Sequence, residues 1–399
     1  MNILYLCHRF PYPPKRGGKI RPFNMIRHLQ ATGHQVTVCS LARSHAEAME
    51  GQGIASHCAA FHMGMVTEPV QFARMIVRLP LVTPSSMGYF YSGELAHKVR
   101  RLLRRQRFDL IFVHCSSVAQ YVENVHGIPK ILDFGDMDSQ KWREYSQHRS
   151  FPLSAGYWLE AVKLERTERL LAGKFDLATC TTRAEMESLR ALGVTTPSDW
   201  FPNGVDAEFF RPGDVAYEPD LVTFVGRMDY FPNQQAVTRF CAEVLPELQH
   251  RRPGTRFEIV GADPPQRIRD LAALPGVTVT GSVPDVRPFV ARATFTVAPL
   301  EIARGTQNKI LESMAMGVPV VCSRQAAGGV DAVPGQHLLA YDDSQQFVAA
   351  MLRLLESREE RGRFSDAARA RVLSNHSWPS SMGRVDALID SQFRKRLAA

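Results

Sequence analysis

The 399-residue sequence has no run of about 18 apolar residues, the length a helix needs to cross a bilayer, so we expect no membrane-spanning segment. Its first residues, MNILYLCHRFPYPP, lack both a basic region before the apolar run and a small-residue cleavage site. They therefore indicate a first β-strand and not a signal peptide. The seven cysteines include no CxxC pair, which is typical of reduced thiols in a cytoplasmic protein and argues against a structural zinc site.

An excess of acidic residues is also missing, and the positive charge is unevenly placed. Residues 1–200 hold 25 Lys/Arg against 17 Asp/Glu, whereas residues 201–399 hold 23 of each, so the net charge of +8 lies in the first half. The densest cluster is KVRRLLRRQR (98–107). It could dock on an anionic membrane surface or an anionic acceptor, or it could be a solvated helix face. Without interleaved aromatic residues, it does not predict nucleic-acid binding.

Short apolar runs alternate with helical segments along the whole chain. Runs that are apolar on both faces are typical of parallel sheets covered by helices. We therefore expect an α/β protein with two doubly wound, Rossmann-like domains facing a cleft. The predicted strands are 2–7, 35–41, 109–115, 130–134 and 176–182 in the first half, and 220–226, 256–261, 277–283, 295–300 and 319–323 in the second.

A segment rich in Pro, Gly and Asp, WFPNGVDAEFFRPGDVAYEPD (200–220), marks the domain boundary. We predict a first domain over 1–204, a linker over 205–219 and a second domain over 220–376. Ligands of such sheets bind outside the carboxyl ends of the strands, so candidate site residues are sought in the loops that follow strands.

Two such loops lie in the first domain. In the loop after the first strand, Gly17 and Gly18 open a helix and could let backbone N–H groups approach a phosphate, with charge added by Lys15, Arg16 and Lys19. A plain loop is an equally good interpretation, because the GxGxxG spacing is missing. His114 ends the strand DLIFVHC and could donate to a substrate or leaving group, or be structural.

The loop DFGDMD (133–138) carries three carboxylates. Their spacing does not match a calcium loop. We expect Asp133, Asp136 and Asp138 to hydrogen-bond sugar hydroxyls or to cap the helix that starts near Ser139.

In the second domain, FVGRMDYFPNQQAV (224–237) places Gly226 at the end of a strand and Arg227 directly after it. The guanidinium could hold a phosphate in a bidentate manner, although a surface Arg on a capped loop is the alternative. Asn233 is expected to cap the helix that begins near Gln234.

The strongest site candidate is ARGTQNKILESMAMGVPVV (303–321). With Thr306 as the helix N-cap, Ile310, Leu311 and Met314 face inward, and Asn308, Lys309 and Glu312 share the other face. The helix N-terminus and Lys309 attract phosphate, and Glu312 one turn later can accept hydrogen bonds from a ribose diol. The spacing suits a nucleoside diphosphate. A plain Lys–Glu surface pair fits less well, because the following strand is apolar.

At these residues the whole chain resembles the retaining GT-B glycosyltransferases of family 4, the "glycosyl transferases group 1" type. PNGVD (202–206) is similar to the interdomain segment of that family, FVGRM (224–228) to its VGR loop and KILESMAMGVPVV (309–321) to its donor-binding helix. SWPSSMGRVDALI (377–389) resembles the C-terminal helix, over about 377–399, that packs back on the first domain. PYPPKRGGKIRPFN, DFGDMDSQKW and RGTQNKILESMAMG further resemble sugar transferases of PEP-CTERM/exosortase exopolysaccharide systems.

The resemblance implies a nucleoside-diphosphate sugar donor, retention at the anomeric carbon, and no metal or other cofactor. By position, Arg227 and Lys309 would hold the diphosphate and Glu312 the ribose, while Gly17 and Gly18 would approach the phosphates. His114 would lie near the transferred sugar. The donor-binding set is then Gly17, Gly18, Gly226, Arg227, Arg304, Thr306, Asn308, Lys309 and Glu312.

Two departures from the family pattern concern charge. The family's first Glu, eight residues before Glu312, is replaced by Arg304, with Glu301 nearby. A Lys shortly after VGR is also missing, and Lys309 or Arg304 could supply its charge. Arg304 could also indicate an acidic sugar donor.

We therefore expect a glycosyltransferase, of hexosyltransferase type, that moves a sugar from a nucleoside-diphosphate sugar to a glycan or polyprenyl-linked acceptor in exopolysaccharide synthesis. A UDP-sugar is the first choice of donor. We expect a cytoplasmic protein, with peripheral contact to the inner face of an anionic membrane. The alternatives are a nucleotide-sugar epimerase or hydrolase of the same architecture, and a non-catalytic nucleotide-sugar-binding protein.

Overall fold

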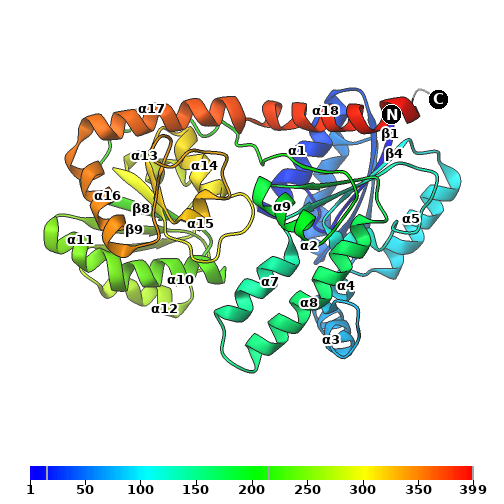
Figure 1. Ribbon diagram of the computed structural model, residues 1–399, viewed down its shortest axis with the longest axis horizontal. Coiled ribbons are helices and arrows are strands. Elements are labelled where there is room, and N and C mark those ends of the chain that lie inside the picture. Colours follow the sequence, from blue (N-terminus) through cyan, green and yellow to red (C-terminus); the bar gives the residue numbers. More distant parts are fainter. Residues whose placement is uncertain (15–16, 214, 398–399) are drawn as a thin grey trace. The chain divides into compact units, whose positions relative to one another are not determined.

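The computed structural model describes residues 1–14, 17–213 and 215–397 (Figure 1). The chain divides into two compact units, Met1–Phe201 with Met382–Ala399, and Pro202–Ser381. Lys15 and Arg16, which were expected to add charge near Gly17, lie outside the described residues.

The first unit is built on a seven-stranded sheet of order β3-β2-β1-β4-β5-β6-β7, in which all pairings are parallel. Its inner strands are buried at every residue except the first of β1 and of β2, as expected for a sheet covered by helices on both faces. The strands are β1 (Asn2–Cys7), β2 (Gln35–Ala42), β3 (Ala60–Met65), β4 (Leu110–His114), β5 (Lys130–Gly135), β6 (Leu177–Cys180) and β7 (Ser198–Trp200).

Helices of the first unit connect these strands and cover the sheet (Figure 1). The buried positions of α5, Leu95, Val99 and Leu102, recur at helical spacing and pack into the core, while most of its arginines face outward. The helices are α1 (Gly17–Ala31), α2 (His45–Gly51), η1 (Gln52–His57), α3 (Glu68–Arg78), α4 (Ser85–Tyr89), α5 (Gly93–Arg105), α6 (Ser116–Ala119), α7 (Asp138–Gln147), α8 (Leu153–Ala172) and α9 (Arg183–Ala191).

The second unit repeats the plan with a six-stranded parallel sheet of order β10-β9-β8-β11-β12-β13. The first strand of the unit, β8, lies in the middle, and the chain winds outward from it in both directions, which is the doubly wound arrangement. The strands are β8 (Leu221–Val225), β9 (Arg256–Val260), β10 (Val277–Gly281), β11 (Phe295–Ala298), β12 (Val320–Cys322) and β13 (Leu339–Ala340).

Helices also flank both faces of the second sheet (Figure 1). Their apolar residues form one continuous core with the strands, which includes Phe224, Phe240, Phe257 and Phe364. The helices are α10 (Phe231–Arg239), η2 (Phe240–Val244), α11 (Leu245–Arg251), α12 (Gln266–Arg269), η3 (Asp270–Ala273), α13 (Arg287–Arg292), α14 (Asn308–Ala315), α15 (Arg324–Ala327), α16 (Ser344–Glu356) and α17 (Arg358–Asn375). The last helix, α18 (Trp378–Leu397), begins in the second unit, and its residues from Met382 onward group with the first.

The segment expected to be a linker belongs to the second unit. Val205 is buried in that unit's core and forms a bridge with Ser377, and the unit already begins at Pro202. The expected boundaries at 204 and 219 therefore differ from the observed division. The reason is that Pro and Gly remove helical and strand periodicity without preventing a segment from packing.

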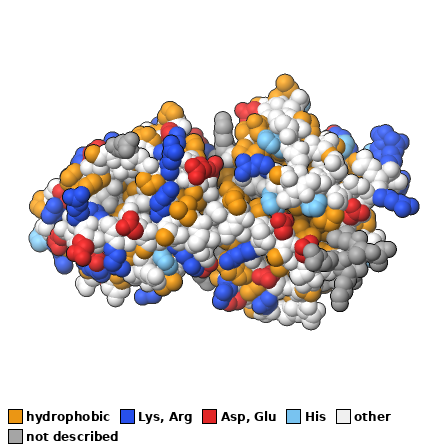
Figure 2. All heavy atoms as spheres, turned by 90° about the horizontal axis from the view of Figure 1, so that it is seen from above, with side chains coloured by type: hydrophobic (Ala, Val, Ile, Leu, Met, Phe, Trp, Pro, Cys, Tyr) orange, Lys and Arg blue, Asp and Glu red, His pale blue; other side chains and the backbone are white. Residues whose placement is uncertain are grey.

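The surface and the thiols fit a globular α/β protein. Apolar, acidic and basic side chains are intermingled on the face shown in Figure 2, with Lys and Arg gathered at the right-hand end of the view. The seven cysteines are all free and buried. Among the described helices, none combines the length and the apolar character that crossing a membrane requires.

Candidate active site

The second sheet has its topological switch point between β8 and β11, where the order of winding reverses. Loops that leave the carboxyl ends of these two strands diverge, which opens the usual ligand crevice of a doubly wound sheet. The loop after β8 carries Gly226 and Arg227 and leads into α10. The segment after β11 carries Arg304 to Gln307 and leads into α14. Every predicted donor-binding residue of this unit therefore lies in a segment that follows β8 or β11.

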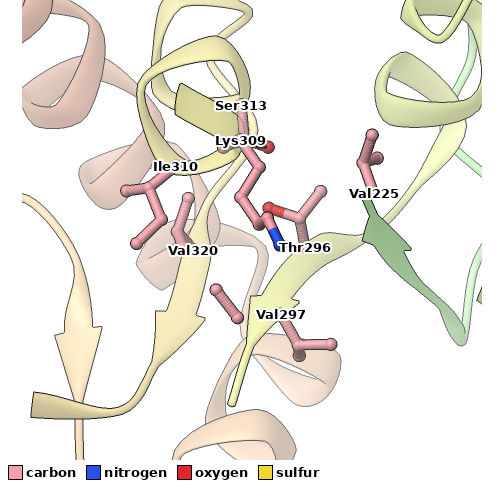
Figure 3. A pocket seen from close by; sticks show the side chains of 8 residues that line it. Val225, Thr296, Val297, Lys309, Ile310, Ser313 and Val320 are labelled. Atoms are coloured by element: carbon pink, nitrogen blue, oxygen red, sulfur yellow. Dashed lines mark hydrogen bonds between the residues drawn. The ribbon is translucent and has the colours of Figure 1, made fainter. Parts of the chain in front are cut away.

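Lys309 connects the two sides of this switch point. Its side chain extends from α14 toward Thr296 on β11 in a narrow space that is otherwise mostly apolar (Figure 3). The ammonium Nζ donates to Asn233 Oδ1 at 2.6 Å and lies 4.3 Å from the centre of the Phe224 ring. Asn233 Nδ2 in turn donates to the carbonyl of Arg227 at 2.8 Å. One contact chain thus fixes the β8 loop, α10 and α14.

Gly226 makes room for this chain of contacts. A Cβ atom at this position would lie 2.8 Å from Asn233 Nδ2 and 3.0 Å from Lys309 Nζ. Both side chains would have to move, and the hydrogen bond from Lys309 Nζ to Asn233 Oδ1 would weaken. The glycine expected to let a phosphate approach therefore also lets the lysine reach the end of β8.

Burial changes the acidity of the pair on α14. Burial lowers the pKa of Lys309 to about 7, with the Glu312 carboxylate acting in the opposite direction. Burial likewise raises the pKa of Glu312 to about 7 against the effect of Lys309. Both groups are poorly solvated in their charged forms, so ligand groups that bind the charged forms would be favoured.

Polar atoms without partners surround the first turn of α14. Thr306 Oγ1 and Asn308 Oδ1 are inaccessible to solvent and accept or donate no hydrogen bond within the described chain. The Glu312 carboxylate likewise makes no hydrogen bond to the described residues beyond its electrostatic contact with Lys309. Buried polar groups are normally satisfied, so this gathering indicates a place prepared for a polar ligand.

The start of α14 differs from the prediction. The helix begins at Asn308 with Gln307 at the N-cap position, so the expected N-cap role of Thr306 is wrong. Gln307 Nε2 instead donates to the carbonyls of Arg304 and Gly305, at 3.1 and 3.4 Å. Gly305 has a φ of +63°, which a residue with a Cβ rarely adopts, and this turn delays the helix by one residue.

Arg227 is partly exposed and already paired with carboxylates. Its guanidinium donates to Asp229 at 3.0 and 2.7 Å and to Asp263 at 2.5 Å, and these partners raise its pKa. A phosphate that binds Arg227 must therefore compete with both carboxylates. Beside this cluster lies an open cavity of about 470 Å³, lined by Asp263, Pro264 and residues 279–282 at the carboxyl end of β10, among others.

Two predictions near the missing family carboxylate have different outcomes. Glu301 pairs with Arg239 on α10 and accepts from Gln235 Nε2 at 2.7 Å, so its carboxylate is already engaged by α10. Arg304 lies in the loop before α14, partly buried, next to the Gly305 turn. The position that holds Glu in the resembled family is therefore occupied by the cationic side chain of Arg304, in the loop that leads into α14. The Asn233 prediction also changes: this residue lies within the first turn of α10, whose N-cap is Tyr230.

In the first unit, His114 lies at the end of β4, also at a switch point of its sheet. Its Nδ1 is 2.8 Å from Asp133 Oδ2, and Asp133 is bound by Arg21 through two contacts of 2.9 Å. Thr179 donates to the same carboxylate at 3.0 Å. Burial alone would raise the pKa of Asp133, but the Arg21 guanidinium and the His114 hydrogen bond hold it well below its usual range.

The expectation that Asp133 binds sugar hydroxyls is wrong, because its carboxylate is fully buried and occupied. Asp136 accepts from the Thr181 hydroxyl at 2.7 Å. The backbone N–H groups at the start of α7 are capped by Glu185 and Glu168, which reach Met137 N and Ser139 N at 2.7 and 3.0 Å. Among the described residues, no group of His, Cys, Asp and Glu could hold a metal ion.

Three features of the first-unit site escaped the sequence analysis. His8 follows β1, its ring centre lies 5.7 Å from that of His114, and its buried Nδ1 has no partner in the described chain. Arg21 anchors Asp133. Cys115, directly after His114, has a φ of +82°, a strained conformation that often marks functional sites. The detectable signal was the strand-end position, which His8 shares with His114.

Around the Gly17–Gly18 pair, α1 begins at Gly17 as predicted. The Arg9 side chain packs close to Gly18, where a Cβ would lie 3.2 Å from Arg9 Cδ. Lys19 is buried and forms an ion pair with Glu47 at 2.6 Å. Its charge is therefore balanced inside the unit and is not offered to a phosphate, contrary to the prediction.

Comparison with known proteins is consistent with this geometry. The family model "Glycosyltransferase Family 4" matches residues 16–209, and "Glycosyl transferases group 1" matches residues 219–357. A sequence search of curated proteins finds no match.

Solved structures resemble the chain over its full length. Sucrose-phosphate synthase from Thermosynechococcus elongatus is 16% identical with a TM-score of 0.73, and covers 99% of this chain and 100% of its own. HepE from Anabaena, in complex with UDP, is 16% identical with a TM-score of 0.70, covering 98% and 100%. A TarM mutant from S. aureus, in complex with Fondaparinux, α-GlcNAc-glycerol and UDP, is 10% identical with a TM-score of 0.67, covering 98% and 100%.

The structural likeness establishes the fold, and the two family matches, one over most of each unit, establish the class of enzyme. The chain is therefore identified as a GT-B glycosyltransferase by its two doubly wound parallel sheets, by the basic residue at the switch point of the second sheet and by these two family matches.

Proposed function

We propose that this enzyme transfers a hexosyl group from a nucleoside-diphosphate sugar, with a UDP-sugar as the first choice, to a glycan or lipid-linked acceptor in cell-envelope polysaccharide synthesis, with retention at the anomeric carbon. The observation that carries the proposal is the contact chain from Lys309 to Asn233 at the switch point, beside the unpartnered oxygens of Thr306 and Asn308 at the start of α14. The UDP-glucose complex of HepE, which has the same fold, supports this choice of donor.

The donor would be held by the second unit. Lys309 and the N-terminal N–H groups of α14 would bind the diphosphate, with Arg227 released from its carboxylates to join them. Glu312 would accept hydrogen bonds from the ribose diol one turn further along α14. Asn308 and Thr306 offer unpartnered oxygens to the same ligand. The cavity lined by Asp263, the partner of Arg227, would take the nucleobase.

The chemistry follows from the charge that develops in the transition state. The bond from the anomeric carbon to the diphosphate oxygen breaks, and a bond forms from that carbon to the acceptor oxygen. The acceptor's proton passes to the departing diphosphate. Lys309 and Arg227 would stabilise the negative charge on that leaving group, which is the role that a bound cation plays in other transferases. We propose that these side chains suffice and that no metal takes part.

The first unit would supply the acceptor side. His114, fixed by Asp133 and Arg21, would donate a hydrogen bond to the transferred sugar, and the N-terminus of α1 at Gly17 and Gly18 would attract an anionic group. A lipid-linked acceptor would place the enzyme at the inner face of the cytoplasmic membrane. The exposed arginines of α5 are compatible with an anionic surface.

A thermal-shift screen with UDP-, GDP- and ADP-sugars tests the donor assignment, because bound ligand raises apparent stability by RT ln(1 + [L]/Kd). Lys309→Ala and Glu312→Ala should each lose at least about 2 kcal/mol of transition-state stabilisation in kcat/KM, since each removes charge-assisted hydrogen bonds. Arg358→Ala, on the exposed start of α17, is the matched control.

Two results would overturn the proposal. Near-normal kcat/KM in both α14 variants would remove the donor site from α14. Rapid formation of an epimer or of free sugar from the donor without acceptor would instead show an epimerase or hydrolase. The shift with the preferred donor should also be absent in Lys309→Ala.

A further inference from the structure

An exposed apolar surface covers α3 and the residues that follow it. Between residues 67 and 83, nearly every side chain is exposed to solvent, although most are apolar. Val77 is 70% exposed, Val82 66% and Phe72 56%. We call this the α3 apolar surface, defined by Val70, Phe72, Ile76, Val77, Leu79, Leu81 and Val82. Such a contiguous patch is unusual on a soluble domain and marks an interaction site.

The polar side of α3 faces the protein, which reverses the usual arrangement. Gln71 is 3% exposed, and its amide end lies 3.2 and 2.7 Å from the carbonyl oxygens of Gly88 and Tyr89. Arg74 donates to the carbonyl of Tyr91 at 2.7 Å. Arg78 packs over Gly88, where a Cβ would lie 2.6 Å from Arg78 Cδ. A surface helix of a soluble protein buries its apolar side. Here the polar contacts hold α3 in place and leave the apolar side outward.

A second apolar group extends this surface onto the hairpin of α7 and α8. Phe151 at the tip is 82% exposed, and Leu153 and Trp158 are more than half exposed. Lys163 on α8 donates to the carbonyl of Leu79 at 2.6 Å, which joins α8 to the end of α3. In Figure 1 the hairpin and α3 extend from the same side of the first unit. The hairpin and α3 therefore lie next to each other on the first unit, and both carry exposed apolar side chains.

The net charge of the first unit favours one kind of binding partner for the α3 apolar surface. The first unit holds 29 Lys/Arg against 19 Asp/Glu, a net charge of +10, whereas the second unit holds 19 against 21. A second copy docked by the same face would bring two units of +10 together. An anionic bilayer would be attracted to the unit and would accept the apolar side chains. Trp158 is of a residue type that is enriched at the headgroup level of membranes.

We propose that the α3 apolar surface, together with the hairpin tip, seats the first unit on an anionic lipid bilayer. An α3 of 11 residues is about 16 Å long, too short to cross a bilayer and suited to lie within the headgroup region. The apolar side chains enter the boundary of the acyl chains, and the charge of the unit draws it to the surface. The proposal rests on the proposed function only for its purpose, access to a lipid-linked acceptor.

Vesicle sedimentation of the full-length protein tests this binding without donor or acceptor. The wild-type protein should sediment with vesicles of 70% phosphatidylcholine and 30% phosphatidylglycerol, and less with phosphatidylcholine alone. Ile76→Glu/Val77→Glu should reduce partitioning at least about tenfold, because two apolar side chains are no longer buried in lipid. The matched control is Val333→Glu/Leu373→Glu, two apolar positions on the second unit that are each about half exposed, and this variant should bind vesicles like the wild type.

Further measurements separate the possible failures. A blue shift of tryptophan fluorescence on vesicles, lost in Trp158→Phe, should accompany binding. Equal far-ultraviolet circular dichroism and an equal donor-induced thermal shift would show that the α3 variant is folded. If the wild type ignores anionic vesicles, or if Ile76→Glu/Val77→Glu converts a dimer into a monomer, the proposal is overturned. If the protein binds vesicles but no nucleotide sugar raises its thermal unfolding midpoint, the membrane-binding proposal is supported and the proposed function is contradicted.

Discussion

Buried ionisable groups in this enzyme are of two kinds, which differ in whether the protein itself neutralises them. The Asp133 carboxylate is hydrogen-bonded by Arg21, His114 and Thr179, so its negative charge is stabilised within the protein and needs no ligand. Lys309 has only a neutral amide and a ring within contact, and Glu312 has only its electrostatic contact with Lys309. The first kind holds the fold in position. The second kind carries unsatisfied binding capacity, as expected of a donor site.

The pH dependence of donor use should reveal the second kind. In the free enzyme, Glu312 must be ionised to accept hydrogen bonds and Lys309 must be protonated to bind phosphate. The pKa of each is near 7, so kcat/KM should rise as Glu312 ionises, fall as Lys309 deprotonates, and peak narrowly around neutral pH. Initial rates between pH 5.5 and 9 measure this profile.

Variants of Lys309 and Glu312 show which residue causes the acid limb and which causes the alkaline limb of the pH profile. Lys309→Arg should move the alkaline limb to higher pH, because a guanidinium stays protonated throughout this range. Glu312→Gln should remove the acid limb at a lower overall rate. A profile that is flat over the whole interval in the wild type would contradict the assignment of both residues.

Removal of one partner from the Asp133 network should destabilise the first unit strongly. Asp133→Ala leaves the Arg21 charge buried without a carboxylate, and we expect a loss of about 3–5 kcal/mol in the free energy of unfolding, measured with urea. Arg21→Met/Asp133→Leu removes both charges and should recover much of this loss. A single-variant loss below about 1 kcal/mol would show that the pair is not essential to the fold.

At the scale of single elements, α7 shows how side chains from other helices accept hydrogen bonds from the backbone N–H groups at a helix N-terminus. Its N-cap, Met137, has no side chain able to accept a hydrogen bond, and the orphan N–H groups are satisfied by Glu185 and Glu168 from α9 and α8. Burial raises the pKa of Glu168 to about 8 and outweighs the hydrogen bonds with Ser139, which lower it; the adjacent Asp138 and Glu185 act in the same direction as burial. The carboxyl group is therefore held in its protonated form near neutral pH.

Burial of the Glu168 carboxyl group predicts a loss of stability toward alkaline pH. The folded-state pKa of Glu168 is raised above its unfolded value of about 4.5, so its contribution is complete below that value and is lost as pH rises through about 8. Glu168→Gln keeps an oxygen that can accept from Ser139 N and carries no charge. Relative to the wild type, its unfolding midpoint in urea should rise between pH 5 and pH 8.5. An equal pH dependence in both proteins would refute the role given to Glu168.

The elements predicted correctly from the sequence are those whose burial requires a recognisable pattern of apolar residues. All ten predicted strands occur, and nine of them are inner parallel strands, which are continuously apolar; the tenth, β10, is an edge strand. The missed strands β3, β7 and β13 lie at sheet edges, where fewer neighbours require apolar side chains. The helix start at Thr306 was wrong because a glycine with positive φ and the Gln307 side chain, not local propensity, set where α14 begins.

At the scale of the molecule, the site was predictable where its residues are close in sequence. Lys309 and Glu312 share one helix face, which spacing alone indicates. Asn233 lies 76 residues from its partner Lys309, and Arg21 lies 112 residues from Asp133. Pairs at such separations depend on the order of strands in the sheet, and their spacing in one sequence carries no signal. The α3 apolar surface was likewise invisible, because apolar residues in a helix ordinarily predict a core.

The two units differ in how the chain builds them, and this gives a test of where the donor binds. The second unit, Pro202–Ser381, is one continuous segment with its own core, whereas the first needs residues from both ends of the chain. A fragment of residues 202–381 should therefore fold alone. Because the proposed diphosphate and ribose groups all lie on this segment, UDP should raise its midpoint of thermal unfolding.

The same fragment carrying Lys309→Ala should show no shift with UDP, and the one carrying Arg358→Ala should respond like the unmodified fragment. Circular dichroism with a cooperative thermal transition establishes that each fragment is folded before the nucleotide is added. A folded fragment that ignores UDP, while the full-length enzyme responds to it, would show that the second unit does not bind the nucleotide by itself. A response that survives Lys309→Ala would move the diphosphate contact to Arg227 and the α14 N-terminus.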